Sequence, residues 1–396
     1  MEIADNTIGG MLEKISKRYP GRDALVHSEK GTRYTYQLLS WQVDQAVCGL
    51  VALGVKRGDH LAIWAANIPE WLVSMLAIAR LGGVFVPIDP GAGQEDLKYI
   101  LDQAECVALM VSGELMDETA GLESRSLENI IVISPPRSKA IGISWPELIS
   151  RGETVKPEEI AHMAEAVLPE DPVAIMYTSG TTGKPKGVVV NHLGLINKSL
   201  CSTERQKITH VDRLCLFFPL FHMFGNTCIA LSGLIRGAAL VMPSQDFDPV
   251  KVLNTVFSEA CTAIYGSPAM FIALLEHHAF TKDRWGTVRT GIVGGAPCPM
   301  ELMKRLVEEI GVSDLTVAYG ITETSSWITM THPDDPLALR VGTIGTPLPC
   351  NEVKIVDPRT GEDLSPQTQG ELCTRGFLMQ EYYRMPGATA AAVDRD

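Results

Sequence analysis

The amino-acid sequence predicts an α/β fold: two αβαβα-type subdomains with mostly parallel sheets, followed by a small β-barrel. Short apolar runs of strand length alternate with amphipathic runs of helix length through most of the chain, a pattern typical of parallel sheets that helices cover on both faces. Near the middle, a run rich in glycine, hydroxyl side chains and lysine separates two apolar runs. From about residue 340, short β-like runs stand between Gly and Pro turns, which suits a small barrel or meander.

The length of 396 residues fits two or three domains of ordinary size. We expect a first α/β subdomain with its N-terminal segment over residues 1–170, a second over 171–338 and the barrel over 339–396. The chain is 45% hydrophobic and carries a net charge of −13. Because an acidic surface repels polyanions, nucleic acid and anionic membranes are disfavoured as main partners. A homodimer is compatible with this composition.

The cysteines and the apolar runs indicate a reducing, aqueous environment. The nine cysteines are scattered and never spaced Cys-x-x-Cys, which favours free thiols in the cytoplasm over disulfides or zinc. The N-terminus carries acidic residues early and has no apolar core segment, so we expect no signal peptide. The most membrane-like run, residues 71–88, is interrupted by Arg80 and Pro87, so a buried helix followed by a strand is expected rather than an integral membrane segment.

Amphipathic spacing and short apolar runs place the elements of the first half. Leu39, Val43 and Leu50 share one face of a helix over 35–53, which Gly54 ends. The other elements expected here are strands over 61–65, 84–86 and 107–111 and helices over 70–81 and 94–105. Residues 117–170 are polar and weakly patterned apart from 130–133, so we expect part of them to form a surface linker.

The second half continues the alternation. The expected strands are 172–177, 188–190, 214–218, 238–242, 263–265, 290–293 and 315–318. The expected helices are 191–200, 223–235, 249–259, 268–277 and 299–310. Short strands over 352–356 and 370–374 belong to the predicted barrel.

The run from Tyr177 to Gly187 has the composition of a phosphate-binding loop. Glycines allow backbone N–H groups to converge on a ligand, hydroxyls donate further hydrogen bonds, and lysines supply positive charge. The run contains no acidic residue. The candidate phosphate contacts are Thr178, Ser179, Gly180, Thr181, Thr182, Gly183 and Lys186.

Two other interpretations of this loop are weaker. A Walker A loop needs four residues between its first glycine and its Gly-Lys pair, whereas only two separate Gly180 from Gly183, and Pro185 follows Lys184. A solvated turn with incidental lysines is the simpler alternative, but ten ordered positions of this kind between two strands argue against it. Of the two lysines, Lys186 follows Pro185 where the strand resumes and can point back to the phosphates, while Lys184 lies nearer the loop tip.

Three later motifs also follow predicted strands, where ligand clefts of α/β proteins open. His222 follows the strand 214–218, although a lone histidine there is more often simply packed or exposed. The small residues of Gly294–Pro297 could accommodate a flat ring, or only form a tight turn. Tyr319–Thr324 offers a ring, hydroxyls and a carboxylate, while a helix cap with a solvated Glu323 is the alternative. A carboxylate with substrate phosphates is a typical set of Mg²⁺ ligands.

Taken in this order, the four motifs resemble the adenylate-forming superfamily of acyl- and aryl-CoA synthetases, firefly-type luciferases and peptide-synthetase adenylation domains. The resemblance extends from about Tyr34 to Arg395. It implies the large N-terminal domain of these enzymes, ATP, Mg²⁺ and CoA as cofactors or co-substrates, and a carboxylic acid substrate. Cys350 stands where a glycine is usual after the preceding proline, which we expect to change a turn and not the chemistry.

The resemblance also implies roles for individual residues. Glu323 would bind Mg²⁺, Thr322 would contact the α-phosphate, and Lys186 and His222 would complete the catalytic set, with His222 beside the substrate carboxylate. The implied nucleotide contacts further include Gly295, Ala296, Pro297, Tyr319, Gly320 and Ile321. The implied acid pocket comprises His222, Met223, Phe224, Gly225, Ser267, Met270, Gly294 and Trp327. Because these are mostly apolar or small, a hydrophobic acid is favoured.

The same resemblance separates the branches of the superfamily. Amino-acid-activating domains carry an acidic residue in the segment after Phe218, and none occurs here before Ala230, so an amino acid substrate is disfavoured. Formation of acyl-AMP and then of a CoA thioester is the expected reaction. The alternatives are a ligase that delivers the acyl group to a carrier protein and a non-catalytic acyl or nucleotide sensor.

The resemblance finally implies further residues after Asp396. A Gly-Trp pair, a Thr-Gly-Asp motif and a mobile domain of roughly 110 to 130 residues would follow. That domain would supply the adenylation lysine and the wall of the thiol tunnel. We therefore expect an engineered large-domain fragment in which the full reaction is slow or absent.

Overall fold

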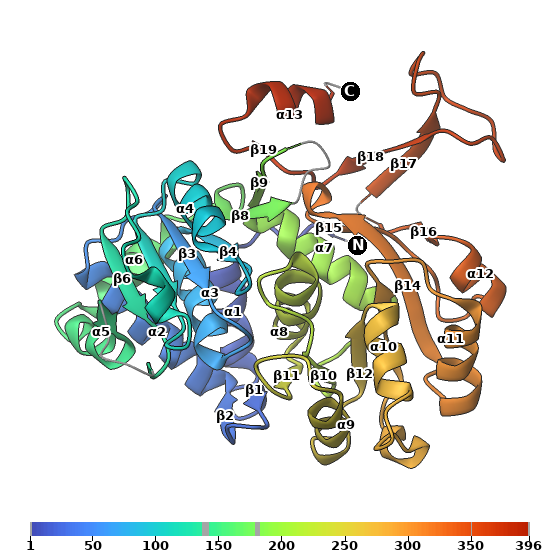
Figure 1. Ribbon diagram of the computed structural model, residues 1–396, viewed down its shortest axis with the longest axis horizontal. Helices are drawn as coiled ribbons and strands as arrows, with labels where there is room; N and C mark the ends of the chain where they lie inside the picture. Colours follow the sequence, from blue (N-terminus) through green and yellow to red (C-terminus); the bar gives the residue numbers. More distant parts are fainter. Residues whose placement is uncertain (1, 137–141, 179–182, 350, 395–396) are drawn as a thin grey trace.

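The computed structural model describes residues 2–136, 142–178, 183–349 and 351–394. The chain forms two large mixed sheets with helices around them and a small third sheet (Figure 1). The helices are α1 Ile8–Arg18, α2 Tyr36–Ala52, α3 Pro69–Leu81, α4 Gln94–Gln103, α5 Trp145–Gly152, α6 Pro157–Glu165, α7 His192–Arg205, α8 Ser232–Arg236, α9 Pro249–Ser258, α10 Pro268–Leu275, α11 Met300–Lys304, α12 Leu337–Gly342 and α13 Pro386–Ala392. Short 3-10 or π segments are η1 Met116–Thr119, η2 Phe224–Leu231, η3 Lys282–Trp285, η4 Arg305–Ile310 and η5 Thr322–Thr324.

The first sheet has eight strands among the described residues, in the order β19-β9-β8-β4-β3-β5-β6-β7. Its strands are β3 His60–Trp64, β4 Val84–Ile88, β5 Ala108–Val111, β6 Asn129–Val132, β7 Ile143–Ser144, β8 Pro172–Thr178, β9 Lys186–Asn191 and β19 Glu381–Tyr382. The strands from β8 to β7 run parallel, while β9 is antiparallel to both β8 and β19. The segment 172–191 therefore extends the sheet of the first half, as an antiparallel hairpin.

The second sheet has nine described strands, in the order β16-β15-β14-β13-β12-β10-β11-β1-β2. Its strands are β1 Asp23–His27, β2 Thr32–Thr35, β10 Arg213–Cys215, β11 Ala239–Met242, β12 Ala263–Gly266, β13 Thr290–Gly294, β14 Asp314–Ile321, β15 Ser326–Met330 and β16 Thr346–Pro347. The six strands from β1 to β14 are parallel, with antiparallel edges on both sides. The prediction of two mostly parallel sheets is confirmed.

Residues 339–396 differ from the predicted β-barrel. They contain a two-stranded antiparallel sheet of β17 Asn351–Val356 and β18 Glu371–Gly376, whose side chains are mostly exposed or half-buried. The other strands of this region pair elsewhere, because β16 adds to the second sheet and β19 to the first. Among the described residues no strands are left to close a barrel.

Many of the helices begin at a residue whose side chain caps the first turn. The hydroxyl of Thr35 accepts from the amide of Leu38 at the start of α2, and the carboxylate of Asp248 accepts from two amides at the start of α9. Such caps satisfy backbone donors that have no partner within the helix. The α3 helix ends at Gly82, whose φ of 81° suits the left-handed position that follows a helix.

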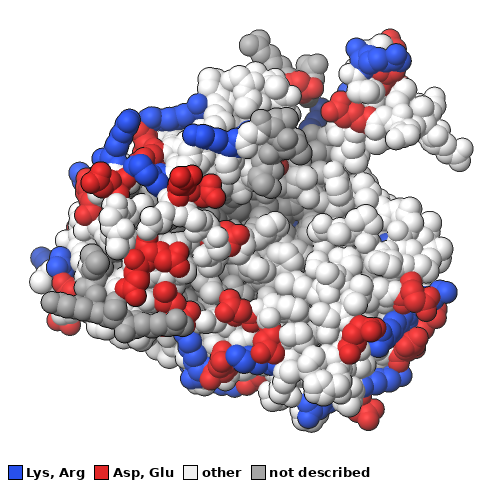
Figure 2. Space-filling view, in the orientation of Figure 1, with Lys and Arg blue, Asp and Glu red and all other residues white. Residues whose placement is uncertain are grey.

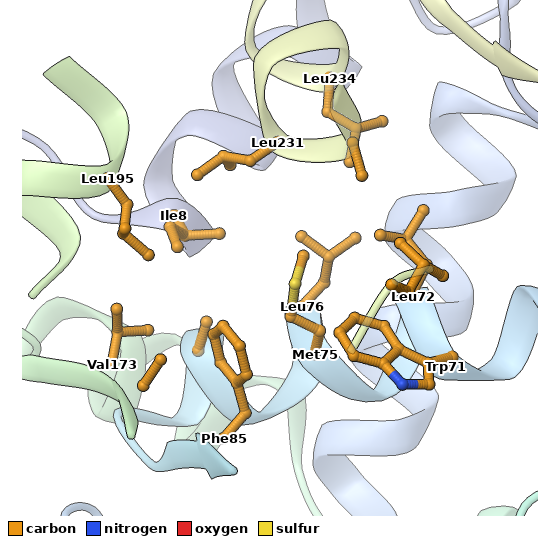
Figure 3. Packing of buried hydrophobic residues seen from close by; sticks show 14 of the residues in the cluster. Ile8, Trp71, Leu72, Met75, Leu76, Phe85, Val173, Leu195, Leu231 and Leu234 are labelled. Atoms are coloured by element: carbon orange, nitrogen blue, oxygen red, sulfur yellow. The ribbon is translucent and has the colours of Figure 1, made fainter. Parts of the chain in front are cut away.

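The largest hydrophobic core joins the two sheets. Ile8 of α1 and Trp71 and Met75 of α3 pack with residues of β4, β8, α7 and α8 in one cluster (Figure 3). Phe85 comes from the first sheet, while Leu234 comes from a helix that covers the second. Burying apolar surface contributes about 25 cal/mol per Å² to stability and favours this arrangement. The two sheets therefore share one buried interior.

Several predicted elements change in extent. The expected linker 117–170 is largely structured, since β6 and β7 extend the first sheet and α5 and α6 lie against α2 and α3. The expected helices 223–235 and 299–310 each divide, because η2 and η4 are wide π segments beside α8 and α11. None of the helices in the described part of the chain is both long and apolar enough to span a membrane.

Candidate active site

A cavity of about 940 Å³ opens where the parallel strands of the second sheet end. Residues that follow β10, β12, β13 and β14 form its walls, as expected for a ligand cleft of an α/β sheet. In Figure 2, charged side chains gather toward the rim of this face, and the hollow at its centre is bordered mostly by uncharged residues. The lining residues are Thr178, Phe218, His222, Met223, Phe224, Cys228, Ser267, Gly295, Ala296, Pro297, Cys298, Val317, Ala318, Tyr319, Gly320, Ile321, Thr322, Glu323, Ser326, Trp327, Val341, Gly342, Thr343 and Ile344.

The hairpin of β8 and β9 carries the two described ends of the predicted phosphate loop. Thr178 at the end of β8 pairs with Lys186 at the start of β9, and Thr178 lines the cavity. The ammonium of Lys186 lies 4.5 Å from the centre of the Tyr382 ring. The ammonium of Lys184 lies 4.9 Å from the centre of the ring of Tyr99, which belongs to α4. The candidates Ser179, Gly180, Thr181 and Thr182 lie outside the described residues.

Glu323 lies in the tight turn η5 between β14 and β15, at the rim of the cavity. Its Oε1 accepts a hydrogen bond of 2.7 Å from the hydroxyl of Tyr382. Ser325 and Ser326 follow with φ angles of 54° and 126°, a left-handed conformation that costs of order 1–3 kcal/mol for each non-glycine residue. Backbone strain of this kind gathers at functional sites, so the turn is a candidate on geometry as well as on sequence.

The His222 ring faces the cavity and is fixed by a local hydrogen bond. Its Nδ1 accepts from the amide of Phe224 over 3.0 Å, so in the neutral ring the proton is on Nε2. The ring is exposed to the cavity, but the surrounding protein displaces bulk water and lowers the pKa of His222 below 6.5. A neutral imidazole with a free Nε2–H donor therefore faces the interior of the site.

Aromatic rings form the apolar end of the cavity. The rings of Phe218 and Phe224 lie 4.4 Å apart, and Phe224 meets Trp327 edge to face at 5.0 Å. Gly294 lies against these rings, since a Cβ atom there would come within 3.0 Å of the Trp327 ring and 3.4 Å of the Phe224 ring. Burial raises the pKa of the lining thiol of Cys298 to about 11, so it is protonated at neutral pH.

Small residues and one ring form the remaining wall. Gly295, Ala296 and Pro297 follow β13, the neighbour of β14, and Tyr319 near the end of β14 is 38% exposed. Gly320 is required by close approach, because a Cβ atom there would lie 2.2 Å from the carbonyl oxygen of Ser326. A flat group could lie between these residues, in keeping with the role expected for them.

Most of the predicted site residues meet in this one cavity, but some lie outside its wall. Gly225 sits against the carbonyl of Pro219 and shapes the turn after His222. Met270 packs against a separate hydrophobic cluster that includes Phe271 and Leu274. Gly183, Lys186 and Gly294 are also absent from the lining. The roles expected for all these residues stay predictions.

Sequence reasoning missed several residues that line the cavity. Phe218 and Cys228 are among them, together with Cys298, Val317, Ala318, Ser326 and residues 341–344. Two of these carried a usable signal: Phe218 ends a predicted strand, and Cys228 follows Phe224 by four residues, one helical turn on.

A metal here would depend on a single protein carboxylate. In the described parts of the chain, no group of three or more His, Cys, Asp and Glu side chains is placed to hold a metal ion. Glu323, with the hydroxyl of Thr322 beside it at the cavity, offers hard oxygen donors. This set fits Mg²⁺ bound mainly through substrate phosphates.

Known proteins resemble this chain along its whole length. YngI of Bacillus subtilis (strain 168), named as a candidate acyl-CoA synthetase, is 38% identical over all of this chain and 75% of its own length. The mitochondrial medium-chain acyl-CoA ligase ACSF2 of Homo sapiens is 31% identical over all of this chain and 68% of its own.

Solved structures share the fold. The N-terminal domain of FACL13 from Mycobacterium tuberculosis has a TM-score of 0.86 at 23% identity and covers 98% of this chain and 94% of its own. The anthranilate CoA ligase AuaEII in complex with anthranoyl-AMP has a TM-score of 0.88 at 22% identity. The match covers 99% of this chain and 74% of that structure. The AMP-binding enzyme family matches residues 12–383. The chain belongs to this family of adenylate-forming enzymes, and its relatives are acyl-CoA ligases.

Proposed function

We propose that this chain binds Mg·ATP and a hydrophobic carboxylic acid, forms acyl-AMP with release of pyrophosphate, and belongs to an enzyme that passes the acyl group to CoA. The observation that carries the proposal is one cavity whose lining has a polar part and an apolar part, called here its phosphate end and its acyl end. One end holds Thr322 and Glu323, and the other is walled by Phe224 and Trp327. A molecule that joins a phosphate to an apolar acid matches both ends.

The residues divide the first reaction between them. A carboxylate oxygen of the acid attacks the α-phosphorus, the bond from that phosphorus to the bridging oxygen breaks, and pyrophosphate leaves. The Nε2–H of His222 can donate to the acid, while Thr322 contacts the α-phosphate and Lys186 the outer phosphates. Mg²⁺, when bound, supplies charge neutralisation next to Glu323. Catalysis on this account is mainly positioning and electrostatic stabilisation.

The acid we propose is a fatty acid of medium length. The walls of the acyl end are aromatic, aliphatic or thiol side chains, and each buried CH₂ group adds about 0.8 kcal/mol of binding free energy. The relatives named as medium-chain acyl-CoA ligases support the same length class. Among the lining residues that the structure describes, no acidic side chain stands at this end to hold an amino group.

Thermal unfolding in the presence of ligands tests the proposal. Acyl-AMP mimics, in which a sulfamate replaces the phosphate, should raise the Tm in the order set by chain length, with the largest shift for about six to ten carbons. AMP alone should give a smaller shift. If no mimic of any length raises the Tm, the proposed function is wrong.

A further inference from the structure

Tyr382 lies between the two residues to which the proposed function gives the phosphate chemistry. Its hydroxyl donates to Oε1 of Glu323 over 2.7 Å, and the Lys186 ammonium lies 4.5 Å from its ring centre. Glu323 belongs to a turn of the nine-stranded sheet, whereas Lys186 starts a strand of the eight-stranded sheet. One side chain from β19 thus contacts candidate residues of both sheets.

The fold sets the position of Tyr382 independently of these two contacts. The amides on either side of it, at Gln380 and Tyr383, donate to carbonyl oxygens of β9 over 2.8 Å. The amide of Tyr382 itself donates to the hydroxyl of Thr389 over 3.0 Å, and the side chain is only 5% exposed. Because β19 is held in this way, the phenol hydroxyl is preorganised at the Glu323 carboxylate.

The chemistry of the phenol suits both partners. A hydroxyl that donates to one carboxylate oxygen fixes the plane of the carboxylate and leaves its other oxygen for a cation. A phenol hydroxyl keeps its proton at neutral pH and can therefore donate to Glu323. The electron-rich ring face attracts the ammonium of Lys186.

We propose that Tyr382 is a positioning residue that orients the Glu323 carboxylate for a divalent cation and holds the Lys186 ammonium at the start of β9. The proposal rests on the function proposed above, because it takes Glu323 as the cation ligand. If Tyr382 served only as an anchor of β19, loss of its hydroxyl would have no effect that depends on Mg²⁺.

The neighbouring Tyr383 supplies a matched control. It is also a tyrosine of the C-terminal segment, and its hydroxyl also donates to a carboxylate, Oε2 of Glu105, over 3.0 Å. Glu105 is not among the residues that line the cavity. Tyr383→Phe therefore removes the same chemical group at a similar structural cost, away from Glu323.

Calorimetric titration of a non-hydrolysable ATP analogue at increasing Mg²⁺ concentrations tests the proposal. Tyr382→Phe should raise the Mg²⁺ concentration needed for tight binding roughly tenfold, as is typical when a partner of a metal ligand is removed. Its affinity for the analogue without Mg²⁺ should equal that of the wild type. Tyr382→Leu, which also removes the ring, should weaken Mg²⁺-free binding about threefold. Tyr383→Phe should match the wild type throughout.

A double-mutant cycle shows whether Tyr382 acts through Glu323. In a Glu323→Gln background, Tyr382→Phe should cause no further loss, because coupled residues are not additive. Additive losses, or equal effects of Tyr382→Phe and Tyr383→Phe, would overturn the positioning role while the proposed function stands. A wild-type chain that binds no analogue at any Mg²⁺ concentration would overturn the proposed function and this inference with it.

Discussion

The two ends of the cavity are held together by different forces. Next to the phosphate end, Lys186, Glu323 and Tyr382 come from three distant segments and meet through a hydrogen bond and a ring contact. At the acyl end, Phe224 follows β10 and Trp327 lies in β15 of the same sheet, and the two meet by ring packing.

This difference suggests how one fold can keep a reaction while changing its substrate. Hydrogen bonds and charges depend steeply on direction and distance, so the phosphate end allows little change. An apolar wall responds to volume, and swaps of hydrophobic side chains are often tolerated. Substitutions at the phosphate end should therefore affect all acids alike, and substitutions at the acyl end should change which acid binds.

The largest effect is expected from Glu323→Gln. Losing the carboxylate removes the only acidic side chain of the described lining, and electrostatic stabilisation by a metal is worth several kcal/mol. The Mg²⁺-dependent gain in ATP affinity should fall about 100-fold in calorimetry, with little change in Tm. A variant that keeps its Mg²⁺ dependence would show that Glu323 does not hold the cation.

The second largest effect is expected from Gly294→Val, which should change the selectivity for the acid. Because a Cβ atom at Gly294 would press on the Trp327 ring at 3.0 Å, the bulkier side chain should push that ring into the acyl end. Loss of space for about two CH₂ groups corresponds to roughly a 15-fold weaker affinity for a long-chain mimic. Competition binding with mimics of graded length measures this.

Binding of AMP to the same variant serves as the control. AMP binds without an acyl group, so its affinity for Gly294→Val should equal that for the wild type. Gly294→Ala should give a smaller shift in the same direction. If AMP is weakened as much as the long mimic, the two ends of the cavity are not separable.

The two loop lysines should differ by a smaller factor. Lys186 pairs with Thr178 at the cavity, whereas Lys184 contacts the Tyr99 ring. Lys186→Ala should weaken ATP binding about tenfold, since one charged contact contributes roughly 1.5 kcal/mol, and Lys184→Ala at most twofold. Equal losses, or the reverse order, would count against this geometry.

The smallest effect concerns the charge of His222. Since burial lowers the pKa of His222 from its ordinary value, the ring should gain its proton at a lower pH than an exposed histidine does. In NMR spectra, the ring C–H resonance absent from His222→Gln should titrate with a midpoint below those of the exposed histidines of the same chain. A midpoint equal to or above theirs would mean that the ring is not desolvated by its surroundings.

The sequence predicted polar motifs better than packing partners. Thr322 and Glu323 stand out because a hydroxyl and a carboxylate directly follow a predicted strand. Val317, which also lines the cavity, does not, because apolar residues of a wall resemble those of any core. Tyr382 was missed because its partner Glu323 is 59 positions away in the chain.

The fold shows the same limit. The alternation of strands and helices is local and predicted both sheets, whereas strand partners are set by tertiary packing. Nothing near Thr346 or Glu381 indicates that β16 and β19 join different large sheets, and so a barrel was expected instead. The weakly patterned residues of β7 and α5 are ordered by their neighbours and less by their own periodicity.

The central claim is that one cavity binds the nucleotide and the acid together. The most direct measurement is calorimetry of a medium-chain acyl-AMP mimic, compared with AMP and with the free acid. The mimic should bind at least 100-fold more tightly than either part, because linking the two removes the cost of binding a second molecule. Gly294→Val should abolish most of that gain. A mimic that binds no more tightly than AMP would contradict the claim.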